Sequence, residues 1–325
     1  MEYVRLGRTG LEVSRLCLGC MSFGDPARGR EWALPLEQSR PILRAAWEAG
    51  VNFFDTANVY SAGSSEEIVG EVLAELAPRD ELVIATKVHG EMRKGPNGRG
   101  LSRKAILGEI DNSLRRLKTD YVDLYQIHRF DPNTPVEETL DALDEIVRSG
   151  KARYIGASSM WAWQFATMLK TQEANGWSRF VSMQNHLNLM YREEEREMLP
   201  LCKAEGIGVI PWSPLARGRL ARPWGEVTKR SETDPFGKTL YEATLAADEG
   251  INGAVADLAA ARGATMAQVA LAWVMAREPV TAPIVGVTKL EQLTDALGAL
   301  DLRLSAYEIA ALEAPYTPRA VAGFQ

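Results

Sequence analysis

Four residues whose side chains can take part in acid–base chemistry lie at or just beyond the ends of three successive strand-like segments. Asp55 ends the first segment and Tyr60 follows it by five residues, while Lys87 and His128 end the next two. A carboxylate, a phenol, an ammonium and an imidazole brought together form a proton donor suited to carbonyl reduction. The residue types therefore indicate carbonyl reduction as a candidate activity.

The four side chains have complementary roles if they meet. A free tyrosine titrates near ~10, and a neighbouring cation such as Lys87 stabilises its phenolate. A buried ammonium tends to lose its proton unless it is paired, and Asp55 supplies the carboxylate that keeps it charged. Tyr60 can then give a proton to the oxygen that hydride addition makes negative, while His128 orients the carbonyl. Singly, each residue could equally cap a helix, carry a solvated charge or fill the core, so the hypothesis depends on all four.

Short apolar segments alternate with helix-periodic segments along the chain. Gly50 and Gly150 follow predicted helices, where a left-handed residue is favoured, and Ser64 and Thr134 are predicted N-caps with a glutamate three residues later. Two further helices, near 265–276 and 305–313, exceed the regular alternation and are predicted to pack outside the strands or across their bottom. The strand candidates are 16–18, 52–55, 82–87, 122–128, 154–158, 181–185, 208–212 and 282–285.

This alternation predicts an α/β fold, namely a closed (β/α)8 TIM barrel that occupies residues 1–325 as a single domain. An N-terminal β-hairpin is predicted around the turn at 7–10. The alternative, an open doubly wound sheet, normally shows Gly-x-Gly-x-x-Gly after its first strand, and this sequence has none there. The segment 213–247, rich in Arg, Gly, Pro and Thr, breaks the alternation and is predicted to be a functional excursion.

Composition favours a soluble enzyme that acts on small molecules. The hydrophobic share of 46% and the charged share of 25% are those of a globular protein. A net charge of −6 argues against a general nucleic-acid or anionic-membrane surface. The first residues lack the apolar stretch of a signal peptide, and the apolar runs are strand-sized, so we expect a cytoplasmic protein without a membrane partner.

Cysteine and histidine usage disfavours a metal or disulfide site. The three cysteines, Cys17, Cys20 and Cys202, are an odd number that suits a reducing compartment. Cys17-x-x-Cys20 could be a redox or metal pair, but it overlaps a predicted buried strand and no second pair completes it. The chain has only three histidines and no His-x-His pair, so a metal-dependent barrel hydrolase is disfavoured and no metal is predicted.

Several motifs resemble the aldo-keto reductase superfamily, and the match runs nearly from end to end. Segments 17–24, 191–200 and 211–218 are similar to the bacterial YajO-type reductases, near relatives of aryl-alcohol dehydrogenases and of the potassium-channel β-subunits. The resemblance implies a barrel that binds NADPH without a Rossmann domain, and it assigns Asp55, Tyr60, Lys87 and His128 as the catalytic tetrad. The motifs that carry it are Phe53-Phe54-Asp55-Thr56-Ala57-x-x-Tyr60, Ser65-Glu66-x-x-x-Gly70, Ala85-Thr86-Lys87, Asp120-Tyr121-Val122-Asp123-Leu124, Ile127-His128 and Gly156-Ala157-Ser158-Ser159.

The resemblance also implies a cofactor site. Trp212 would stack on the nicotinamide ring, and an aromatic face there fixes which side of the ring meets the substrate. Thr288 is the predicted N-cap of a helix whose free amides attract an anion. Lys289 beside it is expected to bind the 2′-phosphate, which indicates NADP rather than NAD. Ser158, Ser159 and Gln184 would contact the carboxamide, and Ser213, Leu215 and Gly218 would lie along the pyrophosphate. The remaining candidates are Gly286, Gln292 and Asp295; relatives often carry Glu then Asn at the adenine, where Asp295 and Ala296 stand here.

Loops around the barrel mouth are expected to select the substrate. Their aromatic content favours an aryl or bulky carbonyl compound, while the cation Arg129 is compatible with a phosphorylated or carboxylated carbonyl compound. Two alternatives remain open: a cofactor-sensing binding module like the channel β-subunits, and a sugar-phosphate-active relative of the kind named 1-deoxyxylulose-5-phosphate synthase. The candidate substrate residues are Met21, Phe23, Trp32, His89, Arg129, Phe130, Trp161 and Phe324.

Overall fold

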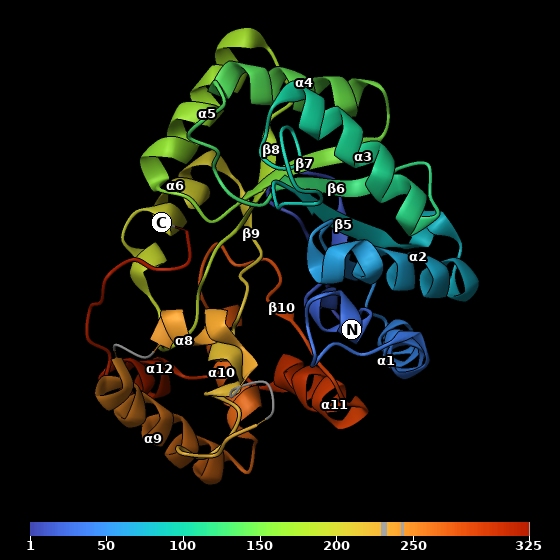
Figure 1. Ribbon diagram of the computed structural model, residues 1–325. Helices are drawn as coiled ribbons and strands as arrows, with labels where there is room; N and C mark the ends of the chain where they lie inside the picture. The colour runs from blue at the N-terminus through green and yellow to red at the C-terminus, as the bar shows by residue number, and fades with distance from the viewer. Residues whose placement is uncertain (229–232, 242–243, 325) are drawn as a thin grey trace.

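Eight parallel strands form the centre of the protein, which is shown as a computed structural model in Figure 1. The structure describes residues 1–228, 233–241 and 244–324. The sheet order is β10-β3-β4-β5-β6-β7-β8-β9, so each strand lies beside the next one in the chain. The strands are β3 (Cys17–Gly19), β4 (Phe53–Asp55), β5 (Val83–Val88), β6 (Val122–Ile127), β7 (Ala152–Ser158), β8 (Phe180–Gln184), β9 (Gly208–Val209) and β10 (Ile284–Val285).

The sheet closes on itself between its last two members. Beyond the regular strand bounds, Thr281 N–H donates to Val209 O at 2.7 Å and Ile284 N–H donates to Pro211 O at 2.9 Å. Cys17 N–H donates to Pro283 O at 3.0 Å on the other side of β10. Closure leaves no exposed strand edge, as a TIM barrel requires. The predicted (β/α)8 barrel is therefore confirmed, and the open-sheet alternative is wrong.

The barrel interior changes from apolar to polar along the strands. At the N-terminal ends the inward positions are apolar, for example Phe53 and Val83, which pack in one buried cluster. Because side chains alternate between the two faces of a strand, the inward positions further along β4, β5 and β6 are Asp55, Lys87 and Gln126. Polar groups thus meet at the C-terminal end of a barrel whose other end is a hydrophobic core.

A ring of helices covers the outside of the barrel. The helix α4 is typical: Leu140, Leu143 and Ile146 form its buried face, with acidic residues in the first turn and Arg148 in the last. The helices are α1 (Leu36–Glu48), α2 (Ser64–Leu76), α3 (Arg103–Leu117), α4 (Val136–Arg148), α5 (Ala162–Asn175), α6 (Met198–Glu205), α8 (Pro235–Tyr241), α9 (Leu245–Arg262), α10 (Met266–Met275), α11 (Leu290–Gly298) and α12 (Ala306–Glu313).

The two helices predicted near 265–276 and 305–313 are present as α10 and α12, but the role predicted for the first is wrong. Helix α10 packs against α11 and precedes β10, so it belongs to the ring. The additional helix of that crossover is α9, which packs on α10 and α12 at the periphery (Figure 1). Periodicity finds these helices but does not say which of them touches the barrel.

Two predicted N-caps are wrong, whereas both predicted C-terminal glycines are confirmed. Ser64 is already inside α2, and its hydroxyl donates to Ser61 O and accepts from Asp25 N–H instead of capping the helix. Helix α4 begins after Pro135, and the Thr134 hydroxyl donates to Asp131. Gly50 and Gly150 have φ of 88° and 79°, the left-handed conformation that follows a helix end. The Ser64 and Thr134 hydroxyls each donate to an acceptor in the loop before the helix, which the cap pattern alone does not predict.

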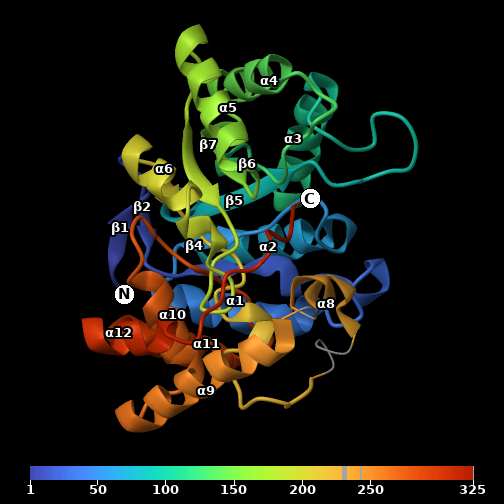
Figure 2. The same ribbon diagram turned by 90° about the vertical axis from the view of Figure 1, so that its left-hand side faces the viewer.

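The two ends of the barrel carry different additions (Figure 2). The predicted hairpin, β1 (Tyr3–Arg5) with β2 (Glu12–Ser14), lies at the N-terminal end, where Leu6 and Val13 pack into the interior cluster. At the opposite end, the C-terminal tail returns from α12 across the strand ends, on the same side as α8. The predicted excursion 213–247 contains α8 and the start of α9, with 229–232 and 242–243 outside the described residues.

Among the described residues, no single helix is long and apolar enough to cross a bilayer. Helices α9 and α10 reach that criterion only when joined, and they are bent by 102° at their junction.

Gly70 tests how closely the ring helices pack. A Cβ added at Gly70 on α2 would lie 2.4 Å from the backbone of Leu117 at the end of α3. We expect Gly70→Ala to lower the free energy of unfolding by about 1–3 kcal/mol, as overpacking does, measured by urea denaturation. Gly108→Ala on α3 is the control, because a Cβ there meets nothing within 4 Å. Equal unfolding midpoints for the two variants would contradict this packing.

Candidate active site

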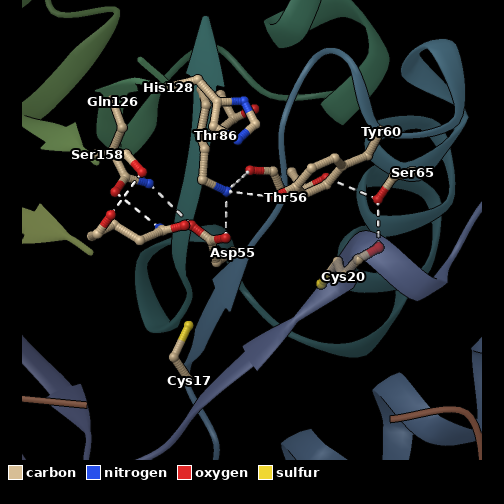
Figure 3. Close-up of polar contacts among 12 residues, drawn as sticks. Cys17, Cys20, Asp55, Thr56, Tyr60, Ser65, Thr86, Gln126, His128 and Ser158 are labelled. Carbon is tan, nitrogen blue, oxygen red and sulfur yellow. Dashed lines mark hydrogen bonds and ion pairs between the residues drawn. The ribbon is translucent and has the colours of Figure 1, made fainter. Parts of the chain in front are cut away.

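A buried ion pair between Lys87 and Asp55 forms the centre of the site (Figure 3). The two residues come from adjacent strands, and Lys87 Nζ lies 2.5 Å from Asp55 Oδ1 and donates to Thr56 O at 2.7 Å. Lys87 is 0% exposed and Asp55 is 2% exposed. Burial alone would lower the pKa of Lys87, but Asp55 and the Tyr60 hydroxyl outweigh it and raise that pKa above its ordinary value. The ammonium therefore keeps its charge inside the barrel.

The Tyr60 hydroxyl faces this ammonium. Lys87 Nζ lies 3.3 Å from Tyr60 Oη and 4.8 Å from the centre of the phenol ring. The chain turns back immediately after Tyr60, where Ser61 and Ala62 have φ of 45° and 49°. Non-glycine residues in this region cost on the order of 1 kcal/mol each. The protein thus keeps a strained turn that holds the phenol over Lys87.

His128 lies beside Tyr60, directly after β6. The two ring centres are 5.7 Å apart and the rings meet edge to face at 79°. Burial and the nearby cations Arg129 and Lys87 lower the pKa of His128 well below its ordinary value. A neutral imidazole carries one N–H, so it can donate a hydrogen bond to a carbonyl oxygen without carrying a charge.

Two glutamine amides, one of them not predicted from the sequence, hold the Asp55 carboxylate. Gln126 Nε2 and Gln184 Nε2 donate to Asp55 Oδ2 at 3.0 and 2.9 Å, and Gln184 Nε2 also lies 3.1 Å from Gln126 Oε1. Gln126 was missed, although it stands two residues before His128 and therefore on the same face of β6. Both oxygens of Asp55 thus accept hydrogen bonds, which offsets the cost of burying its charge.

The loop that carries Tyr60 is tied to its neighbours by hydroxyl groups (Figure 3). The hydroxyls of Thr56 and Ser65 are 2.9 Å apart, and Ser65 Oγ donates to Cys20 O at 2.7 Å. These contacts join the end of β4 to the first turn of α2 and to the loop after β3. Ser65 belongs to the sequence motif noted above, and its contribution here is to fix the start of the loop.

Trp212 forms the end of an aromatic stack on the other side of the barrel. Its indole lies 4.1 Å from His186 at an interplanar angle of 9°, and His186 stacks in turn on Tyr191 at 4.2 Å. The indole N–H donates to Ser159 Oγ at 2.9 Å. His186 thus covers one face of the indole, and the centre of the indole also lies 6.2 Å from that of the Phe236 ring and 6.0 Å from the Arg129 guanidinium.

The predicted carboxamide contacts lie next to this stack. The Ser158 hydroxyl donates to Gln184 O at 2.7 Å, and Ser159 N–H donates to the same carbonyl at 3.1 Å. The ends of β7 and β8 therefore carry three polar side chains beside Trp212. Their arrangement fits the polar edge of a nicotinamide, with the indole plane beside it.

The loop after β9 has an unusual backbone. Ser213, Ala216 and Arg217 all have positive φ, of 52°, 47° and 56°, although none is a glycine. Gly218 follows with φ of 93°, and a Cβ there would meet the Arg222 guanidinium at 3.0 Å. Leu215 has φ of −98° and Ala216 has φ of 47°, and a right-handed residue followed by a left-handed one turns backbone amides toward a common centre, which favours phosphate binding. The predicted pyrophosphate residues Ser213, Leu215 and Gly218 belong to this loop.

The start of α11 differs from the predicted cap. The helix begins at Leu290 with Lys289 as the N-cap residue and without a side-chain cap, so the cap predicted at Thr288 is wrong. Thr288 N–H instead donates to Gln292 Oε1 at 2.8 Å. Asp295 accepts from the Thr265 hydroxyl at 2.6 Å and so joins α11 to α10. Lys289 and Gly286 are exposed beside this helix start, where a phosphate is favoured.

The candidate substrate residues separate into two groups. Phe23 is 0% exposed and packs in the outer hydrophobic core, so the expectation that it contacts a substrate is wrong. Trp32 is half-buried on the loop before α1. Arg129 and Trp161 meet the C-terminal tail: Arg129 Nε donates to Gly323 O at 3.1 Å, and Trp161 contacts the Phe324 ring edge to face at 5.2 Å. The tail therefore brings distant candidates together beside His128.

The cysteine pair does not form one site. Cys17 belongs to the cluster inside the barrel, whereas Cys20 packs in the core outside it. Burial raises the pKa of both thiols, which keeps them protonated. Within the described part of the chain, no group of three or more His, Cys, Asp or Glu residues is placed to hold a metal ion.

A cavity of about 400 Å³ lies away from this chemistry. It is lined by residues around Arg15 and Val280, before the first and last strands of the barrel, and so at its N-terminal end. Arg15 there donates to the carbonyls of Val280 and Met275. TIM barrels carry their active sites at the C-terminal end, where Asp55, Tyr60, Lys87 and His128 are found.

The fold and this site define an oxidoreductase of the aldo-keto reductase type. The sequence profile of the Aldo/keto reductase family matches residues 15–316, and the chain belongs to that family. Relatives match over nearly the whole chain. It is 45% identical to the versiconal hemiacetal acetate reductase of Aspergillus parasiticus, over 99% of this chain and 98% of that protein. It is 44% identical to a Schizosaccharomyces pombe protein named as an aryl-alcohol dehydrogenase, over 99% of this chain and 97% of that protein. An aldo-keto reductase of Alternaria alternata is 42% identical, over 99% and 93%.

Replacement of Asp55 tests the central ion pair. We expect Asp55→Asn to lower the free energy of unfolding by about 3–5 kcal/mol, because it leaves Lys87 buried without its carboxylate. In the native protein the raised pKa means that the Lys87 contribution is complete below 10.5 and is lost only above it. In the variant, burial should bring the pKa of Lys87 below 10.5, so the unfolded chain binds more protons and stability rises with pH toward that value.

The measurement is urea unfolding at about pH 7 and about pH 9.5. Asp111→Asn is the matched control, because its partner Lys151 is well exposed and a surface pair contributes little. A variant at residue 55 that loses no more stability than this control, with no rise toward high pH, would contradict the role of the pair.

Proposed function

We propose that this protein is an NADPH-dependent reductase of aldehydes or ketones, with Tyr60 as the general acid. The observation that carries the proposal is the position of Lys87, which contacts Asp55 on one side and the Tyr60 hydroxyl on the other. A phenol beside a permanently charged ammonium can release its proton, because the phenolate that results is stabilised where it forms.

The proton step follows from the same geometry. Hydride addition to the carbonyl carbon places negative charge on the oxygen, and Tyr60 transfers its proton to that oxygen. The Tyr60 phenolate is then stabilised by Lys87, and water returns the proton. His128, neutral and beside the phenol, donates an N–H to the carbonyl and so orients it. Asp55 acts through Lys87, since it keeps the ammonium charged.

Bound NADPH supplies the hydride, and the residues at the ends of β7 to β10 fit such a molecule. The face of Trp212 away from His186 would hold the nicotinamide ring, and Ser158, Ser159 and Gln184 would fix its carboxamide. The strained loop with Ser213, Leu215 and Gly218 would hold the pyrophosphate. Gly286, Thr288, Lys289, Gln292 and Asp295 lie at and beyond β10, and Lys289 is the candidate for the 2′-phosphate that distinguishes NADPH from NADH.

Aromatic aldehydes are the proposed substrates. Trp161, Phe324 and Trp212 lie around the strand ends near His128, and flat aromatic compounds suit such surroundings. The names of the relatives, a hemiacetal acetate reductase and an aryl-alcohol dehydrogenase, agree with a carbonyl or alcohol of this kind.

The direct test is oxidation of NADPH, followed by absorbance, with a panel of aldehydes that begins with 4-nitrobenzaldehyde. We expect turnover with several aryl aldehydes. Binding of NADPH without turnover on any member of the panel would instead favour a cofactor-sensing protein, and absence of both binding and turnover would overturn the proposal.

Tyr60→Phe separates the acid from the rest of the site. The phenol is removed while the cofactor contacts are kept, so we expect kcat to fall by about 10²–10⁴-fold with little change in the Kd for NADPH measured by fluorescence. Tyr307→Phe, at a residue 84% exposed on α12, is the control and should keep full activity. Undiminished turnover in Tyr60→Phe would show that another group supplies the proton.

Lys289→Ala tests the preference between the two cofactors. Loss of a charged hydrogen bond to the 2′-phosphate should raise the KM for NADPH by about tenfold or more, while NADH, which lacks this phosphate, is affected far less. The control is Lys170→Ala on the exposed face of α5. Equal effects on the KM of both cofactors would assign the 2′-phosphate to other residues.

A further inference from the structure

Arg129 is a half-buried cation that lacks a carboxylate partner among the described residues. Its Nη1 donates to His128 O at 2.6 Å and its Nε donates to Gly323 O at 3.1 Å, and both acceptors are neutral carbonyls. In the described ranges no acidic side chain forms an ion pair with it. Burial lowers the pKa of Arg129 from its ordinary value, although a guanidinium still stays charged. A half-buried guanidinium without a carboxylate beside it remains able to pair with an anion that enters the site.

Two of the neighbouring cations have carboxylate partners. Lys87 is paired with Asp55, and Arg217 is paired with Asp234 in the excursion. Arg30 is half-buried on the loop before α1. Its guanidinium lies 5.2 Å from the centre of the Tyr60 ring. After burial, the cations that lower the pKa of His128 include Arg129, Lys87 and Arg30. Several cations therefore lie near the proposed position of the reacting carbonyl.

The location of Arg129 separates it from the proposed phosphate sites. It follows His128 directly in the chain, and its guanidinium lies 6.0 Å from the centre of the Trp212 ring, where the nicotinamide end of the cofactor is proposed. The proposed pyrophosphate and 2′-phosphate residues are on the loops after β9 and β10 instead. A cation at the nicotinamide end faces the substrate rather than the cofactor phosphates.

We propose that the substrate carries an anionic oxygen group, a carboxylate or a phosphate, that pairs with Arg129 while its carbonyl faces Tyr60 and His128; this rests on the proposed reductase function. The guanidinium has N–H groups beyond the two that bind carbonyls, and it matches two oxygens of one anion at once. Trp161 and Phe324, in edge-to-face contact beside it, suit an aromatic body between the anion and the carbonyl. Arg30 adds a second positive charge on the other side of Tyr60.

The test compares pairs of aryl aldehydes that differ in charge. The first pair is 4-carboxybenzaldehyde and methyl 4-formylbenzoate, and the second is 4-formylphenyl phosphate and 4-methoxybenzaldehyde. We expect the native protein to show the higher kcat/KM for the anion of at least one pair, and the pair with the larger ratio identifies carboxylate or phosphate. Arg129→Met should lower that ratio by about tenfold to a hundredfold, the range of a charged hydrogen bond.

Two further variants make the result specific. Arg129→Lys keeps the charge but not the two-pronged geometry, so it should restore part of the ratio. Arg148→Met, on the outer helix α4 with its side chain 69% exposed, should leave the ratio at the native value. Circular dichroism at each step confirms that the variants are folded.

A binding measurement separates failure of this inference from failure of the proposed function. Calorimetric titration with 4-methylbenzoate, which has no aldehyde to reduce, should show binding to the native protein and weaker binding to Arg129→Met. If the neutral aldehydes are reduced but neither anion is preferred, or if Arg129→Met leaves the ratios unchanged, the anion site is overturned while the reductase stands. If no aldehyde is reduced yet Arg129-dependent titration persists, the reductase is overturned and the anion site stands.

Discussion

The buried pair of Lys87 and Asp55 is the interaction on which the rest of the site depends. Two charges inside a barrel are costly unless nearly every polar atom is satisfied. The protein meets this cost with Thr56 O on Lys87 and with the amides of Gln126 and Gln184 on Asp55. Four strands thus contribute to one charged group. The ion pair of Lys87 and Asp55 lies above an apolar interior, which fixes the direction of the ammonium. The hydroxyl of Tyr60 is positioned against that ammonium.

Fixed geometry elsewhere in the site comes from strain and stacking. The turn after Tyr60 and the loop after β9 both contain non-glycine residues in the left-handed region, which persist only because surrounding contacts over-determine them. Trp212 is held by a stacked His186 and by Ser159. His186 is itself neutral, because burial lowers its pKa well below the ordinary value. A rigid indole and a rigid phenol on opposite sides of the barrel end define the space between them.

Charge is distributed unevenly around that space. A protein of net charge −6 places Arg30, Lys87 and Arg129 around the neutral imidazole of His128. Of the nearby carboxylates, Asp55 and Asp234 form ion pairs with Lys87 and Arg217, while Asp131 accepts hydrogen bonds from backbone N–H groups and the Thr134 hydroxyl. The electropositive strand ends are therefore a local product of the fold that the overall composition does not reveal. The proposed acid Tyr60 needs a cation beside it, and the proposed anionic substrate also needs a cation. The same local positive charge therefore serves both.

The sequence by itself determined the barrel and the four residues at its centre, because alternation of strands with helices is a local pattern and parallel strands end together at one side. It did not find Gln126, it placed Thr288 and Ser64 as caps, and it expected Phe23 to contact the substrate. Ser64 and Thr288 have competing partners within four residues that the cap pattern does not distinguish. The bond from Gln126 to Asp55 and the burial of Phe23 depend on segments far apart in the chain. The same holds for Arg129, whose partner Gly323 lies nearly two hundred residues away. Periodicity fixes which face a residue occupies, whereas long-range packing decides what it meets there.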